Sequence, residues 1–305
     1  MTIASNLNEF LGKRVENFNP ETGIVNPETV VYRINTDYDE AAQEFDAKLD
    51  AFANDARVGE VTQLIIGMFD QESSTTTESL VNKLVSFKDK LQQLTHLFIG
   101  DITYQECEIS WIQQSDMSPL LAAFPQLEYF RVRGGDGLRI TAFAHANLNT
   151  LIIETGGLGP DTLKDIMAAD LPKLEKLELW LGSENYGFAS TVEDYATIIS
   201  GEKFPGLKSL GLKNSEIQDE IAIALSTSPF VKQLDVLDLS MGVLSDKGGE
   251  ALLNSPAVKE LSFLDLRHHY LSNEMMGKLQ SLGIKINLDE QETADKYGPY
   301  IEVSE

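Results

Sequence analysis

The chain has 305 residues, of which 42% are apolar and one is a cysteine. Its 48 acidic residues outnumber its 24 basic residues, and the net charge of −24 repels phosphate backbones and anionic lipid, so we expect no nucleic-acid partner and no membrane partner. A lone cysteine forms no internal disulfide and the first residues, MTIASNLNEF, do not resemble a secretory signal, which together favour a cytoplasmic location.

The first 60 residues predict an N-terminal segment followed by a degenerate capping repeat. Residues 1–28 show little periodicity, which leaves open whether they are ordered along the surface. Residues 29–36, TVVYRINT, alternate in a way that predicts a strand with Val30, Tyr32 and Ile34 on one face. A helix is expected over residues 41–53.

Residues 61–288 are dominated by an internal repeat of the form L-x-x-L-x-L, whose three apolar positions lie on one side of a short strand. The repeat begins at residues 61, 94, 127, 148, 174, 207, 234 and 261, as VTQLII, LTHLFI, LEYFRV, LNTLII, LEKLEL, LKSLGL, LDVLDL and LSFLDL. Segments with helical periodicity, such as DTLKDIMAAD and STVEDYATII, separate the hexamers. Eight hexamers that alternate with helices predict one stacked supersecondary unit, repeated along the chain.

Residues 100–119, GDITYQECEISWIQQSDMSP, interrupt this pattern after the second hexamer. Alternation predicts a strand-like loop that places Cys107, Ile109 and Trp111 on one face and packs on the repeats. The neighbouring carboxylates of Glu106 and Glu108 disfavour a thiolate, so Cys107 is expected to be an inert thiol. A solvated acidic edge is favoured over a Ca²⁺ or Mg²⁺ site, although the sequence does not decide between them.

The C-terminal end predicts a cap. IKINL at 284–288 fits a last strand, and residues 289–305 form an acidic tail in which Tyr297, Tyr300, Ile301 and Val303 are available to cover exposed apolar surface. Stacked repeats share neighbours, so residues 1–305 are expected to form a single domain.

The units LKSLGLKNSEIQDEIAIAL and LDVLDLSMGVLSDKGGEALL resemble the leucine-rich repeats, in the longer form found in ribonuclease inhibitors. The resemblance implies an α/β solenoid, or horseshoe, with a parallel β-sheet on the concave face and helices on the convex face. The ninth repeat position departs from the family, which has Asn or Cys there, and predicts irregular turns. It holds Phe69, Ile102, Gly135, Gly156, Gly182, Ser215, Gly242 and His269.

A narrower resemblance rests on the 100–119 stretch together with ELWLGSENYG, LGLKNSEI, LDLRHHYLS and the terminal YIEVSE. These segments are similar to a family of bacterial cytoplasmic leucine-rich-repeat proteins whose members carry no assigned activity. The resemblance implies a bacterial origin and a partner enzyme encoded nearby, and it supplies no catalytic residue.

Catalytic and cofactor motifs are absent from the sequence. It contains no phosphate-binding glycine loop, no G-x-S-x-G and no H-E-x-x-H, and GGDG at 134–137 fits a tight turn. His268 and His269 would point to opposite sides of a strand and therefore share no metal face. We accordingly expect no enzyme activity, no cofactor and no metal.

The favoured function is a non-catalytic scaffold that binds a protein or peptide with its concave face and rim loops. Arg133 and Trp180 are the expected anchors, and Glu106 and Glu108 would orient a basic group of the partner. The alternative is an enzyme or metal-dependent accessory protein that uses the acidic loop 101–111 with Arg131 or His268. The expected partner-binding residues are Asp101, Glu106, Glu108, Trp111, Arg131, Arg133, Glu178, Trp180, Glu184, Asn185, Tyr186, Lys213, Asn214, Asp238, Asp265, Arg267 and His268.

Overall fold

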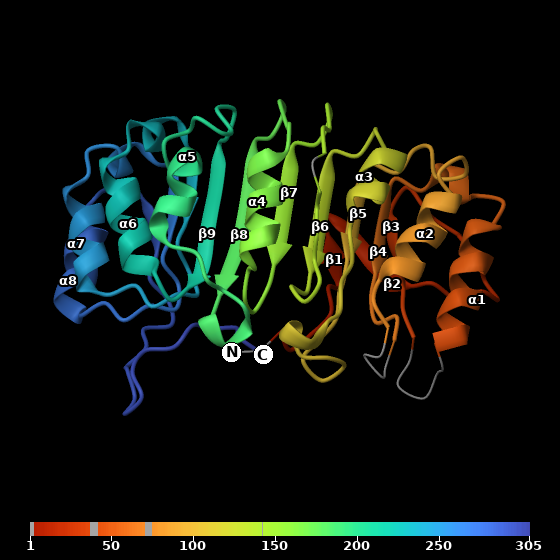
Figure 1. The fold of residues 1–305 in the computed structure, drawn as a ribbon, viewed down its shortest axis with the longest axis horizontal. Helices are drawn as coiled ribbons and strands as arrows, with labels where there is room; N and C mark the ends of the chain where they lie inside the picture. Colours follow the sequence, from red (N-terminus) through yellow and green to blue (C-terminus); the bar gives the residue numbers. More distant parts are fainter. Residues whose placement is uncertain (1–2, 37–41, 71–74, 142) are drawn as a thin grey trace. The chain divides into compact units, whose positions relative to one another are not determined.

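The computed structural model describes residues 3–36, 42–70, 75–141 and 143–305 (Figure 1). The chain divides into two compact units. The N-terminal unit consists mainly of residues 2–153 and 161–173, and the C-terminal unit consists mainly of residues 154–160 and 174–304.

The strands of the N-terminal unit hydrogen-bond to one another in the order of the sequence. They are β1 (Glu9–Phe10), β2 (Lys13–Asn17), β3 (Val30–Ile34), β4 (Gln63–Ile66), β5 (His96–Ile99), β6 (Tyr129–Arg133) and β7 (Thr150–Glu154). The pair β1–β2 is antiparallel, and the pairs from β2–β3 to β5–β6 are parallel. The predicted strand over 29–36 is thus confirmed as β3, in the place of a first, degenerate repeat.

Helices accompany these strands, and each of the first three connects the two strands of a parallel pair (Figure 1). They are α1 (Ala42–Ala53), α2 (Glu78–Ser86), α3 (Ser118–Ala123) and α4 (Pro160–Ala168), with the short 3₁₀ helices η1 (Val58–Glu60) and η2 (Ile109–Trp111). A parallel pair requires such a crossover, because the chain must return to the same end of the sheet before the next strand starts.

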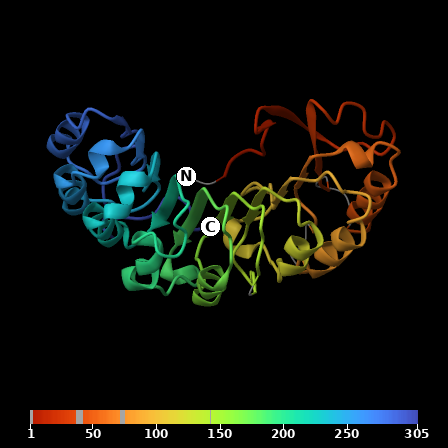
Figure 2. The same cartoon turned by 90° about the horizontal axis from the view of Figure 1, so that it is seen from above.

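The C-terminal unit repeats the same arrangement. Its strands are β8 (Lys176–Gly182), β9 (Ser209–Ser215), β10 (Val236–Asp238), β11 (Phe263–Asp265) and β12 (Lys285–Asn287), and they pair parallel in sequence order. Its helices are α5 (Ala196–Ile199), α6 (Gln218–Thr227), α7 (Asp246–Asn254) and α8 (Asn273–Gln280), with η3 (Glu184–Tyr186), η4 (Val192–Tyr195), η5 (Pro229–Gln233) and η6 (Val258–Glu260). Figure 2 shows α6, α7 and α8 on one side of the strands. Among the described residues, no helix has the length and apolar character that a bilayer crossing requires.

The core of each unit is built from the hexamers, in the register that the sequence predicts. The fourth hexamer positions Leu177, Leu210, Leu237 and Leu264 lie opposite one another on neighbouring strands, and all four are fully buried. In the N-terminal unit, Leu64, Leu97 and Phe130 are aligned and buried in the same way. Each unit therefore has the leucine-rich-repeat architecture, an open and mostly parallel sheet with helices on one face.

The N-terminal segment covers the face of the sheet that the helices leave free, which we call the open face. Phe10 is buried against fifth-position side chains of the strands, namely Ile65, Phe98 and Ile152. In Figure 2 the segment (red) runs on the side of the strands opposite α2 and α3. Residues 3–28 thus have a defined place on the sheet, which explains why the fifth positions of this unit are largely apolar.

The loop after β5 is not the strand-like element that alternation predicted. The side chain of Glu106 accepts hydrogen bonds from the backbone N–H and the hydroxyl of Thr103, which close a turn instead of an extended run. The chain then forms η2, where Ile109 is buried while Trp111 is 62% exposed. The side chain of Cys107 packs, half-buried, against a small apolar cluster.

Two ninth-position residues show how the turns differ from those of the family. A Cβ at Gly182 would overlap the carbonyl group of Gly156, and Gly182 has a φ of +78°, so this turn requires glycine. His269 is fully buried, and its ring links neighbouring turns in the way the family's Asn or Cys does. Its Nδ1 accepts from the Leu271 N–H at 3.2 Å, and its Nε2 lies 3.1 Å from the Leu288 carbonyl oxygen. The irregular turns that were predicted are therefore present.

Burial lowers the pKa of both His145 and His269 below the ordinary histidine value. The unfolded chain, with histidine pKa values of about 6.5, then binds more protons than the folded chain at mildly acidic pH. We therefore expect the free energy of unfolding to be at its full value above about pH 6.5 and to decrease as the pH falls below it. Urea unfolding at pH 7.5 and pH 5.5 measures this loss, and His269→Asn should show a smaller one. An identical loss in the variant would contradict the assignment to His269.

Candidate functional site

The N-terminal unit holds Asp101, Glu106, Glu108, Trp111, Arg131 and Arg133 from the predicted set. Asp101 is 1% exposed, and its carboxylate lies 2.7 Å from the guanidinium of Arg33 and accepts from the Leu7 backbone N–H at 3.1 Å. Arg133 is also buried; it donates to the Ile102 carbonyl at 2.8 Å and lies 4.0 Å from Asp101. Both side chains are therefore committed to contacts within the unit, and neither is the exposed group that an anchor for a partner requires.

The other members of this set differ in exposure. Glu106 accepts from Asn6 as well as from Thr103, so its carboxylate also ties the N-terminal segment to the loop. Arg131 is half-buried, with its guanidinium 4.1 Å from the centre of the Phe98 ring. Glu108 is half-buried, and Trp111 is the one that is mainly exposed.

The open face of the C-terminal unit carries a charge cluster centred on Lys213. The ammonium group of Lys213 lies 2.7 Å from a carboxylate oxygen of Asp238 and 3.8 Å from one of Glu178. Burial would lower the pKa of Lys213, but the two carboxylates raise it above its ordinary value, so the residue remains a cation. Lys213 therefore neutralises only part of the acidic charge on this face.

Asp265 adds a third carboxylate to the cluster. It lies directly opposite Asp238 on the neighbouring strand, a pairing of like charges that costs stability in a sheet. Burial raises the pKa of the Asp265 carboxyl, and the charge of Asp238 raises it further. Lys176 is a second cation of the cluster, since its ammonium group lies 3.3 Å from Glu178. Three carboxylates against two ammonium groups still leave an excess of negative charge, suited to a cationic group of a partner.

The side chain of Trp180, the second expected anchor, is 8% exposed. Its indole N–H donates to the Glu178 carboxylate at 3.0 Å, and the Lys213 ammonium lies 5.8 Å from its ring. The role of Trp180 in this structure is thus to support the charge cluster. Glu184 and Asn185 are exposed on η3, with Tyr186 half-buried beside them.

The remaining predicted residues, Asn214, Arg267 and His268, contact the C-terminal tail. Asn214 and His268 are buried, and Arg267 forms ion pairs with Glu290 and Glu302. The tail residues Tyr300, Glu302 and Val303 were not among the predicted site residues. The alternation of buried Ile301 and Val303 with Glu302 was the available signal, since it is typical of an extended segment that packs on a surface.

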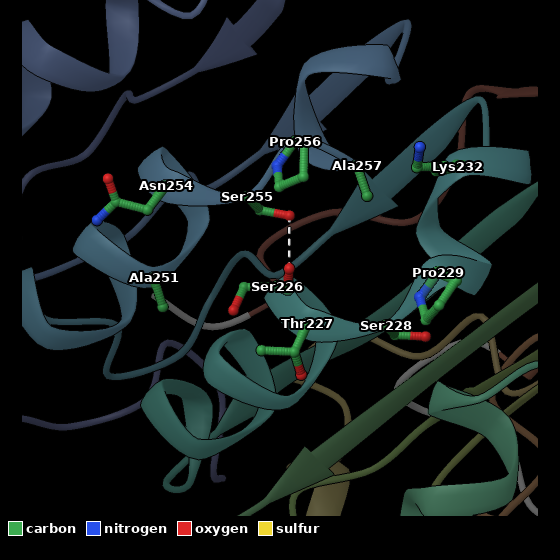
Figure 3. Close-up of a pocket in the computed structure, with 10 residues that line it drawn as sticks. All are labelled: Ser226, Thr227, Ser228, Pro229, Lys232, Ala251, Asn254, Ser255, Pro256 and Ala257. Carbon is green, nitrogen blue, oxygen red and sulfur yellow. Dashed lines mark hydrogen bonds between the residues drawn. The ribbon is translucent and has the colours of Figure 1, made fainter.

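A pocket of about 450 Å³ lies on the helix side of this unit, between residues 226–232 and residues 251–257 (Figure 3). The pocket results from a change of residue size between consecutive repeats. In one repeat the ring of Phe230 packs tightly over Gly201. In the next, Ala257 takes the place of Phe230 and Ser228 the place of Gly201, so the large ring is missing. The hydroxyl of Ser255 donates to the Ser226 carbonyl at 2.6 Å across its floor. The pocket is thus a gap between repeats, and the hydroxyl groups of Thr227, Ser228 and Ser255 that line it each donate to a backbone carbonyl group of the chain.

The residues that the structure describes include no group of three or more His, Cys, Asp or Glu side chains placed to hold a metal ion. In the acidic loop, the carboxylates of Asp101 and Glu106 accept hydrogen bonds from the chain itself. This arrangement gives no support to the alternative of a metal-dependent or catalytic loop at 101–111.

The repeated hexamers and the parallel strands define a leucine-rich-repeat protein. A Bacteroides fragilis protein, whose crystal structure was determined by the Northeast Structural Genomics Consortium, is 34% identical, with a TM-score of 0.82 over 88% of this chain and 76% of that protein. The chain belongs to the same family as that Bacteroides fragilis protein. An internalin from Listeria monocytogenes is 17% identical, with a TM-score of 0.39 over 88% of this chain and 74% of its own. Comparisons with protein-family models and with curated proteins gave no match.

Proposed function

We propose that this protein is a non-catalytic scaffold that binds a protein or peptide partner on the open face of its C-terminal unit. Leucine-rich repeats commonly serve as protein-binding surfaces, because their stacked strands present a long row of side chains. The proposal extends this general property to one face of this chain. The partner enzyme encoded nearby, which the family resemblance implies, is a candidate for the bound protein.

The observation that carries the proposal is the contrast between the two open faces. In the N-terminal unit, fifth-position Ile65 and Phe98 are buried beneath Phe10 of the chain's own N-terminal segment. In the C-terminal unit, fifth-position Glu178 and Asp238 are charged, and their side chains keep 14% and 19% of their surface exposed. Charged side chains on a partly exposed sheet face favour binding of a partner over packing within the chain.

The partner that this charge favours carries basic side chains. A Lys or Arg group placed near Asp238 and Asp265 would relieve the repulsion between these in-register carboxylates. Lys213 already occupies the other side of Asp238, so the position nearer Asp265 is the one that suits an incoming cation. The charge also predicts an association rate that decreases as the salt concentration rises.

The test compares two variants with the same change in net charge. Asp238→Asn with Asp265→Asn should weaken capture of the basic partner at least tenfold, because both carboxylates of the open face lose their charge. Glu250→Gln with Glu274→Gln, on the exposed faces of α7 and α8, should leave capture unchanged. The measurement is the amount of partner retained from the native cell extract by each immobilised chain, after its fold is checked by circular dichroism.

Two outcomes would contradict the proposal. Equal retention by the open-face variant and the wild-type chain would place the site elsewhere. Loss of the partner in the helix-face variant alone would assign binding to the helices.

A further inference from the structure

The C-terminal tail crosses the ends of three strands of the C-terminal unit in the manner of a bound peptide. Val303 donates its backbone N–H to the side-chain oxygen of Asn214 at 3.0 Å, and the Asn214 amide donates back to the Val303 carbonyl at 2.5 Å. Asn214 is fully buried, so this pair of hydrogen bonds is shielded from water. The side-chain amide of Asn214 thus satisfies both backbone groups of Val303, which holds this tail residue in place.

The next contacts fix a carboxylate in the tail. Glu302 donates its backbone N–H to the Met241 carbonyl at 2.9 Å. Its carboxylate faces the guanidinium of Arg267, with both oxygens 2.9 Å from a different guanidinium nitrogen. One oxygen accepts a hydrogen bond from Arg267 and the other forms an ion pair with it, and charge-assisted contacts of this kind are strong, so this position favours an acidic residue.

The remaining tail residues fill positions on either side of Glu302. Ile301 is 5% exposed and Val303 is 3% exposed, so both aliphatic side chains are seated in the surface. Tyr300 exchanges two hydrogen bonds of 2.9 Å with the hydroxyl of Tyr270, through its backbone N–H and its carbonyl. Its ring centre lies 6.0 Å from that of His268. The contacts therefore select an aliphatic–carboxylate–aliphatic triplet in an extended segment.

Three observations separate this tail from an ordinary terminal cap. Residues 293–297, which lead to it, are exposed. The tail returns past β12, the last strand, to contact the chain at the ends of β9, β10 and β11. The residues beneath it, Asn214, Met241 and His268, have φ values of 52°, 69° and 56°, a left-handed conformation that is costly for residues other than glycine.

His268 adds a further indication. The residue is 3% exposed, and neither of its ring nitrogens has a hydrogen-bond partner in the structure. A buried polar group without a partner costs stability and is retained where it serves another purpose. Its position under Tyr300 places this unsatisfied donor and acceptor within the surface that the tail covers.

We infer that Asn214, Met241, Arg267 and His268, the strand-end rim, form a binding site for extended segments with an aliphatic–carboxylate–aliphatic triplet. The chain's own tail occupies this site, and a partner segment with the same triplet displaces it. The site adjoins the open face at Arg267, whose backbone N–H donates to the Asp265 carboxylate at 3.0 Å. The test below changes neither Asp238 nor Asp265, so the inference can fail while the proposed function holds.

The test uses the 305-residue chain and a fluorescent peptide with the sequence of residues 298–305, GPYIEVSE. In the chain, Ile301→Asp with Val303→Asp removes the two seated side chains and frees the rim. The peptide should bind this tail variant at least tenfold more tightly than the wild-type chain, as measured by fluorescence anisotropy. Adding Asn214→Ala should weaken binding at least tenfold, and a peptide with Lys at the position of Glu302 should bind at least tenfold more weakly.

Two results with the tail variant would overturn the inference. One is a folded tail variant that does not bind the peptide, and the other is binding that is insensitive to Asn214→Ala. The wild-type chain provides a second measurement, in case the tail variant does not fold. Excess peptide should accelerate hydrogen exchange at the amides of Glu302 and Val303, and unchanged exchange would contradict displacement. Wild-type dimers that excess peptide dissociates would show a second copy's tail as an occupant, which also supports the site.

Discussion

Asp101→Ala is expected to lower the free energy of unfolding by about 3–5 kcal/mol, because it leaves buried cationic side chains without their counter-charge. Asp101 is 1% exposed, and the side chain of Arg33, its ion-pair partner, is 11% exposed. The same change removes the acceptor of the Leu7 backbone N–H, which anchors the N-terminal segment on the open face. Urea unfolding gives the free energy, and hydrogen exchange at Leu7 reports the release of the segment.

Two variants isolate the contribution of the charge. Asp101→Asn keeps an acceptor for the Leu7 N–H but removes the negative charge, so it should be nearly as destabilising as the alanine variant. Glu108→Ala, in the same acidic loop but half-buried, should change the free energy of unfolding by less than about 1 kcal/mol. If Asp101→Ala had no more effect than Glu108→Ala, the buried ion pair would not be what holds this segment.

The repeat and its register were predictable because the apolar positions of the hexamer identify the side chains that face the core. The first, fourth and sixth positions bury their side chains whatever lies around them, as Leu207, Leu210 and Leu212 show. The strand over 29–36 and the last strand near 284–288 were found in the same way, from alternation alone. Periodicity carries this information because burial on one face is a local consequence of the backbone geometry.

The candidate site was less predictable, because the exposure of a side chain at a strand end depends on whether a segment distant in sequence packs over it. The sequence places Arg133 and Asn214 beyond the core positions, but it does not show that Asp101 and Val303 meet them. The partners lie far apart in the chain, and the terminal segments that supply the coverage lack the repeat. One signal was available: fifth-position residues change from Ile65 and Phe98 to Asp238 and Asp265 along the chain, which marks where the open face ceases to be apolar.

Leu237→Ala is expected to lower the free energy of unfolding by about 2–5 kcal/mol, from lost burial and the cavity that remains. Leu237 is fully buried and lies between Leu210 and Leu264, the equivalent residues of the two neighbouring strands. Its removal therefore weakens two interfaces between repeats at once, and the stability of stacked repeats depends on such interfaces. The measurement is the free energy of unfolding in urea, together with the slope of the transition.

Val236→Ala is the matched control, because Val236 precedes Leu237 on β10 and is half-buried on the open face. Its substitution should cost less than about 1.5 kcal/mol, since it removes fewer buried methyl groups and leaves the stack of leucines intact. A shift of one residue in strand register would exchange the two faces. If Val236→Ala were the more destabilising variant, Val236 and not Leu237 would face the helices, and the register on which both units are built would be wrong.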